Sequence, residues 1–136
     1  MVTYVLDSSA VLRYLHGEAG DQRVEQIIGA HLAGDCDLLI SAIHWGEIAG
    51  VTCKNHGLAA VDLVLGRLSS FGFKVVDASA QRAVQASLIK VKRKLPYADA
   101  FGVELASESP DHVLVTADFD LKAAARDVKI EFLPRK

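Results

Sequence analysis

Two aspartates in this 136-residue chain lie at or just beyond the ends of short apolar segments that have the character of buried strands. Asp7 closes the segment Val2–Leu6, and Asp118 lies just beyond the segment His112–Val115. In a parallel sheet the carboxyl ends of the strands meet at one edge, and ligands of open α/β sheets bind there. We therefore expect the two carboxylates to lie at one rim of the protein.

Two further acids lie among apolar neighbours on predicted helices. Glu47 has Ile43 and Val51 four residues away on either side, and Asp99 lies in the first turn of a helix that Pro96 opens. A carboxylate on an apolar stripe is costly unless it is paired, protonated or bound to a metal. We therefore expect Glu47 to carry a raised pKa in the metal-free protein.

Each acid also has an ordinary structural interpretation. Asp7, Asp118 and Asp120 could cap helices, Asp99 could stabilise a helix dipole, and Glu47 could reach solvent from the edge of its stripe. Taken together, however, clustered carboxylates repel one another, and a hard divalent cation relieves that repulsion. Oxygen ligands favour Mg²⁺ or Mn²⁺ over Zn²⁺. Such a site activates water for phosphoryl chemistry.

The elements that must position these acids alternate between strands and helices. Strands are predicted at residues 2–6, 37–40, 73–76, 112–115 and 130–133. A first helix is predicted to begin at Ala10, with Ser8 and Ser9 as its N-cap residues. Further helices are predicted at residues 18–32, 43–56, 58–68, 78–94, 96–107 and 121–127. This alternation implies parallel crossovers. We expect an α/β fold, a three-layer α/β/α sandwich with a four- to five-stranded parallel sheet, in one domain spanning residues 1–136.

Composition is that of an ordinary globular protein, with 51% hydrophobic and 24% charged residues. The net charge of −2 excludes a protein that coats nucleic acid passively. Cys36 and Cys53 form no closely spaced pair, which indicates a reducing compartment. No basic, apolar leader opens the chain, and no apolar run approaches the ~18 residues that a membrane span needs. We expect a cytoplasmic protein that does not enter a membrane.

Four segments of the chain resemble the motifs of the PIN-domain family and, within it, of the single-domain VapC-type toxins. They are VLDSSAVL at 5–12, Ser41 with Glu47, PYADAF at 96–101 and TADFD at 116–120. The order and spacing of the four are more specific than any one alone. The resemblance implies a PIN-like fold and a metal-dependent endoribonuclease, the toxin of a type II toxin–antitoxin system. It further implies a homodimer that a VapB-type antitoxin inhibits.

The same resemblance assigns roles to individual residues, with Mg²⁺ or Mn²⁺ as the cofactor. The catalytic and metal-binding acids would be Asp7, Glu47, Asp99 and Asp118. Ser9 and Thr116 would support them, and Asp120 adds a second acid to the fourth motif. We favour Asp118 as the acid that faces the metal, because it directly follows Thr116-Ala117. The segment 44–46 (His-Trp-Gly) departs from the small or aliphatic residues that are commoner in the family, which alters the wall of the cleft.

Basic side chains near the predicted site are candidate contacts for RNA phosphates. Lys92, Arg93 and Lys94 end the long helix that precedes Asp99, and Arg13 lies on the helix that follows Asp7. A cationic last helical turn also complements the helix dipole, so the run has a purely structural explanation as well.

Two other functions stay open at this point. A PIN-like interaction module without turnover would keep the fold, although the intact set of four acids argues against it. A receiver-like phosphotransfer domain could use Asp77, which follows the third predicted strand, but no partner lysine follows the fourth. A zinc site built from Cys53 and His56 with Cys36 and His44 fits no standard ligand spacing.

Overall fold

The computed structural model describes residues 1–136 and contains one five-stranded sheet in which every pair of neighbours is parallel. The strands are β1 (Thr3–Leu6), β2 (Asp37–Ser41), β3 (Lys74–Val76), β4 (His112–Thr116) and β5 (Lys129–Phe132). Their order across the sheet is β3-β2-β1-β4-β5. The predicted α/β class and the parallel sheet are therefore confirmed.

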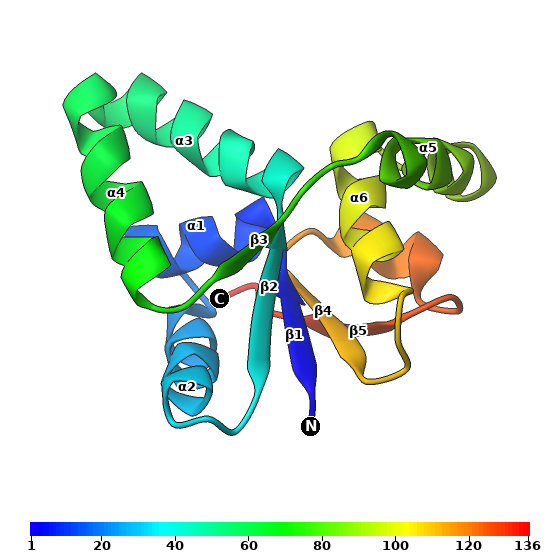
Figure 1. Ribbon diagram of the computed structural model, residues 1–136, viewed down its shortest axis with the longest axis horizontal. Helices are drawn as coiled ribbons and strands as arrows, with labels where there is room; N and C mark the ends of the chain where they lie inside the picture. The colour runs from blue at the N-terminus through cyan, green and yellow to red at the C-terminus, as the bar shows by residue number, and fades with distance from the viewer.

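Helices cover both faces of this sheet (Figure 1). One face carries α1 (Ser8–His16), α2 (Asp21–Leu32), α3 (Ala42–His56) and α4 (Leu58–Ser70). The other carries α5 (Ala80–Arg93), α6 (Tyr97–Ala106) and the 3₁₀ helix η1 (Phe119–Ala124). No helix combines the length and the hydropathy that crossing a bilayer requires.

Alternation along β1 divides the apolar core between the two helical layers. Leu6 packs with Val11 and Ile27 on one side of the sheet, whereas the preceding Val5 packs with Val103 and Leu114 on the other. Successive side chains of a strand point to opposite faces, so a central strand that is covered on both sides must be apolar throughout. This explains why the end of β1 is deeply buried.

The chain path reverses between β1 and β4. The first connections lead from β1 to β2 and on to β3, and the chain then returns through α5 and α6 to β4 on the far side of β1. Leu6 pairs with Val115, so both strands end at the same level. The crevice at such a switch point is where open α/β sheets bind ligands.

Two predicted boundaries are wrong, each for a local reason. The second helix begins at Asp21 rather than at residue 18, because Gly17 and Gly20 adopt left-handed backbone conformations that separate it from α1. The helix predicted at 121–127 is the 3₁₀ helix η1, which begins at Phe119 because the Asp118 side chain accepts a hydrogen bond from the Asp120 amide.

Two left-handed glycines give a test of packing at the end of the sheet. A Cβ at Gly20 would lie 2.8 Å from Cβ of the buried Leu133, whereas a Cβ at Gly34 would meet nothing within 4 Å. Gly34→Ala should cost about 1 kcal/mol from backbone strain alone. Gly20→Ala should cost about 1–3 kcal/mol more, because the core must also shift. Urea denaturation measures both, and equal losses would show that Leu133 yields freely.

Candidate active site

Asp7 is the most deeply buried of the four acids and is held by three donors. It follows β1, is 3% exposed, and caps α1 by accepting a hydrogen bond from the Ala10 amide at 3.0 Å. Ser9 Oγ donates to one carboxylate oxygen at 2.6 Å, and Thr116 Oγ1 donates to the other at 2.5 Å. Burial raises the pKa of Asp7, while nearby His44 and these three hydrogen bonds act to lower it.

The two hydroxyls that hold Asp7 also tie it to the end of β4. Ser9 Oγ accepts from the amide of Ala117 at 2.9 Å, and Thr116 Oγ1 accepts from the amide of Asp118 at 2.9 Å. Each hydroxyl therefore donates to the carboxylate and accepts from backbone. The network fixes the segment that carries Asp118 against the end of β1.

Asp118 and Asp120 take different places in the fourth motif. Asp118 is half-buried and caps η1, where one carboxylate oxygen accepts from the Asp120 amide at 3.0 Å. The Asp120 side chain is exposed, so only its backbone contributes to this turn. Of the two, Asp118 is the one that contacts another acid.

Asp99 is the acid whose ionisation the site disturbs most clearly. It lies in the first turn of α6, and its Oδ2 is buried without any hydrogen-bond partner. Burial raises the pKa of Asp99 to about 7, with further contributions from a hydrogen bond to the Asp118 side chain and from the charges of Asp118, Asp7 and Glu47. Two carboxylates in contact are best accommodated when they share a proton.

Glu47 approaches the site from α3, and our interpretation of its surroundings was wrong. The buried face of α3 is formed by His44, Ile48 and Thr52, and the Glu47 side chain is 44% exposed. Ser8 Oγ donates to Glu47 Oε1 at 2.8 Å. The carboxyls whose pKa burial raises in this site are those of Asp99 and Asp7.

The fold thus brings the four acids to one edge, from β1, β4, α3 and α6, but as they stand no three His, Cys, Asp or Glu side chains form a ready metal cage. All donors are oxygens, and Asp99 keeps one buried oxygen free. Hard divalent cations prefer such a set, so the residues present fit a Mg²⁺ or Mn²⁺ ion. An approaching cation would also remove the repulsion between Asp99 and Asp118.

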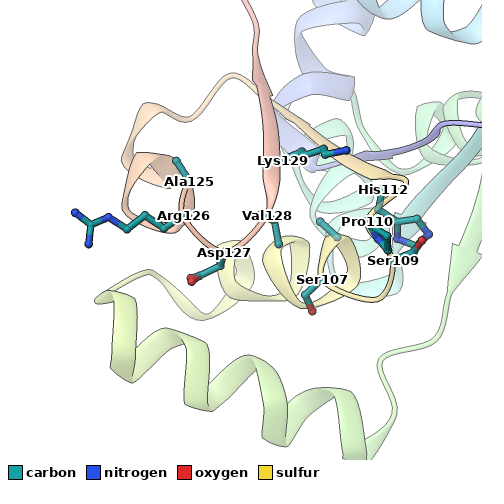
Figure 2. Close-up of a pocket in the computed structure, with 10 residues that line it drawn as sticks. Ser107, Ser109, Pro110, His112, Ala125, Arg126, Asp127, Val128 and Lys129 are labelled. Carbon is teal, nitrogen blue, oxygen red and sulfur yellow. The ribbon is translucent and has the colours of Figure 1, made fainter.

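The four acids lie outside the cavities of the protein. None of the five cavities in the protein is lined by Asp7, Glu47, Asp99 or Asp118. Figure 2 shows one of these cavities, of about 340 Å³, lined by Ser107, His112 and Lys129 among others. It lies where β4 and β5 begin, at the opposite edge of the sheet from the acids.

Of the basic residues named from the sequence, the two arginines bond to other groups of the protein and the two lysines form no ion pair. Arg93 makes a bidentate pair with Asp127 at 2.7 and 2.6 Å, and Arg13 donates to the Ala19 carbonyl at 3.2 Å. Both therefore serve structural contacts. Lys92 and Lys94 are exposed and form no ion pair, so they stay candidates for contact with a phosphate backbone.

His44 is the residue near the acids whose contacts the sequence did not predict. It is 1% exposed, and its Nε2 lies 2.9 Å from the Ala98 carbonyl and 3.9 Å from Glu47 Oε1. The sequence did carry a signal for this residue. His44 lies three residues before Glu47, at a position where small or aliphatic side chains are typical.

A parallel sheet with carboxylates gathered at its switch point defines an α/β protein with an oxygen-donor site at the carboxyl edge of the sheet. The PIN domain profile matches residues 4–127, so this chain belongs to the PIN domain family. PIN-domain nucleases generally use divalent metal ions. The receiver-like alternative has no support, because receiver sheets follow the order 2-1-3-4-5 and Asp77 follows an edge strand here.

Solved structures share this fold over almost the whole chain. DNA-bound VapBC from Salmonella typhimurium is 19% identical with a TM-score of 0.69, over 97% of this chain and 98% of that chain. VapBC2 from Rickettsia felis, bound to a DNA fragment from its promoter, is 16% identical with a TM-score of 0.70, over 96% and 98%. A toxin–antitoxin complex from Klebsiella pneumoniae is 19% identical with a TM-score of 0.65, over 94% and 95%. No curated protein gives a significant sequence match.

The raised pKa of Asp99 predicts how the stability of the metal-free protein depends on pH. An aspartate with a usual pKa of 3.8 that titrates at about 7 in the folded protein binds more protons folded than unfolded between those values. Stability must therefore fall as the pH rises through this window, and the raised pKa of Asp7 acts in the same direction. We expect the melting temperature in EDTA to decrease by a few degrees from pH 5 to pH 8.

Thermal melts of two variants of α6 separate this effect from general destabilisation. Asp99→Asn should flatten the decline with pH, because it removes the titrating group. Phe101→Leu, in the buried part of the same helix, should lower the melting temperature at every pH and keep the native slope. A metal-free native protein that becomes more stable from pH 5 to pH 8 would contradict the assignment.

Proposed function

We propose that this PIN-domain protein is a metal-dependent endoribonuclease that hydrolyses RNA phosphodiester bonds and acts as the toxin of a type II toxin–antitoxin pair. The observation that carries the proposal is Asp99, a carboxyl with a pKa of about 7 and a free buried oxygen, crowded by three other acids. Asp7, Glu47, Asp99 and Asp118 would hold Mg²⁺ or Mn²⁺. A divalent ion in such a site lowers the pKa of water and offsets charge that develops on the phosphate.

The remaining residues of the site keep this set of acids in place. Ser9 and Thr116 orient both oxygens of Asp7, and Ser8 holds Glu47 by one oxygen. Asp99 would release its shared proton when the ion binds, because ligating carboxylates must be ionised. No cavity is lined by the four acids and Glu47 is 44% exposed, so a polymeric substrate would approach from the surface.

The partners that we propose are RNA, a VapB-type antitoxin and a second copy of the chain. The solved VapBC complexes with the same fold support the antitoxin. Exposed Leu58 and Leu63 on α4, and Leu88 and Val91 on α5, offer apolar surface that a protein partner would cover. Light scattering on the purified protein measures the proposed dimer. The free thiols of Cys36 and Cys53 fit a reducing compartment such as the cytoplasm.

RNA cleavage tests the catalytic proposal directly. The purified protein should cleave RNA with Mg²⁺ or Mn²⁺, stop in EDTA, and gain little from Zn²⁺. Asp118→Asn should lower the rate about 100-fold or more, because it removes a charge from the site while an asparagine still caps η1. Asp120→Asn should cleave at close to the native rate, because that side chain is exposed. Robust cleavage in EDTA, or no cleavage under any condition, would favour a different mechanism or an inactive module.

Charge reversal tests the proposed contact with RNA. Lys92→Glu combined with Lys94→Glu should raise KM and reduce the slope of log affinity against log salt by about 1.4, if each lysine contacts one phosphate of a single strand. Arg93→Ala is the matched control, because this arginine already pairs with Asp127 and should affect stability more than RNA affinity. An unchanged salt slope in the double variant would assign the lysines to the helix dipole alone.

A further inference from the structure

His44 makes one hydrogen bond, and that bond joins two helices. The residue lies in the first turn of α3, and its Nε2 is 2.9 Å from the carbonyl oxygen of Ala98 in the first turn of α6. Because a carbonyl oxygen can only accept, Nε2 carries the hydrogen and donates it. The other ring nitrogen, Nδ1, is buried and has no partner.

The two ends of this bond adjoin two of the candidate acids. His44 precedes Glu47 by three residues, and Ala98 immediately precedes Asp99. The helices α3 and α6 follow different strands and cover opposite faces of the sheet (Figure 1). The spacing between Glu47 and Asp99 therefore depends on how α3 meets α6, and the bond from His44 is the one hydrogen bond between them.

A glycine on α6 lets the imidazole pack closely against that helix. A Cβ at Gly102 would lie 3.2 Å from Cε1 of His44 and 3.3 Å from Cδ1 of Leu114. Leu114 is fully buried in the core, so it has little freedom to move away. Glycine within a helix weakens that helix relative to alanine. The missing side chain at position 102 thus costs α6 stability, and a methyl group there would push the ring away by a few tenths of an ångström.

We infer that His44 is a positioning residue: its hydrogen bond to Ala98, seated in the space at Gly102, sets the separation of Glu47 and Asp99. The inference rests on the proposed function, since it concerns acids that would share one divalent ion. The unpartnered Nδ1 supports a positioning role. An apolar side chain of similar volume would fill the same space without burying a polar nitrogen that has no hydrogen-bond partner. The bond to Ala98 requires a polar ring, and the same Nε2 also lies 3.9 Å from Glu47 Oε1.

Mn²⁺ affinity of the metal-stripped full chain, measured by calorimetry, tests this inference together with melting temperatures in EDTA. His44→Leu removes the donor, His44→Gln keeps an N–H at the distance of Nε2, and His44→Asn moves the N–H to the distance of Nδ1. We expect the affinity to fall about tenfold or more for the Leu and Asn variants and to stay within about threefold of native for Gln.

The control variant is Ile48→Ala, on the same helix. Ile48 packs in the core on the α1–α4 side of the sheet, so its truncation should lower the melting temperature and leave Mn²⁺ affinity intact. Gly102→Ala is an independent test that leaves His44 in the chain. Its methyl group should displace the ring and weaken Mn²⁺ binding as His44→Leu does, although alanine favours the helix.

Three outcomes would overturn the positioning role. The first is that His44→Leu and Gly102→Ala bind Mn²⁺ with the native affinity. The second is that the loss of Mn²⁺ affinity parallels the fall in melting temperature in every variant, including Ile48→Ala. The third is given by hydrogen exchange. A native protein that binds no Mn²⁺ would instead refute the proposed function. Hydrogen exchange of the metal-free proteins then decides the inference: the second-turn amides of α6, which bond to first-turn carbonyls, should exchange faster in His44→Leu than in native or His44→Gln, and equal rates reject it.

Discussion

The burial of one carboxylate at the end of the central strand determines the arrangement of the whole acidic edge. Asp7 lies between two covered faces of a parallel sheet, where an isolated charge is costly. The fold meets that cost with the hydroxyls of Ser9 and Thr116 and with the Ala10 amide. Because both hydroxyls also accept amides that follow β4, stabilising Asp7 simultaneously positions Asp118. The hydrogen bonds that solve a local burial problem are those that build the site.

Asp99 adds a second constraint that the chain does not satisfy by itself. One of its oxygens is buried without a partner, and it is in contact with the carboxyl of Asp118. Two adjacent carboxyls repel each other when both are ionised, and this repulsion destabilises the folded protein. A protein selected for stability alone would therefore replace one of this pair. A divalent cation removes the conflict, which is why a site that forms no ready cage still has the chemistry of a metal site. The repulsion is the reason the acids need a ligand.

The sequence predicted the positions of strands and acids well because both depend on short-range patterns. Apolar runs ended by Asp7 and Asp118 fixed where the sheet would end, and parallel crossovers then placed both acids at one edge. The surroundings of Glu47 were misjudged, because neighbours at helical spacing do not reveal which side of a helix faces the core. The pair formed by Arg93 and Asp127 was not foreseeable either, since it joins residues 34 positions apart that meet only in the folded chain. Hydrophobic periodicity and short motifs do not predict polar contacts between residues that are far apart in the sequence.

Asp7 and Asp118 show that a structural and a functional explanation of the same residue need not compete. Each caps a helix by accepting a hydrogen bond from an amide of the following turn. This agrees with the structural interpretation of both residues as helix caps. Capping uses lone pairs of a carboxylate, and it also holds the carboxylate at the positive end of a helix, where negative charge is favoured. Asparagine caps as well as aspartate does but carries no charge, so the capping role explains a polar side chain at these positions and not an ionised one. Capping does not require the negative charge of either aspartate. That charge instead acts on Asp99, whose pKa both residues raise.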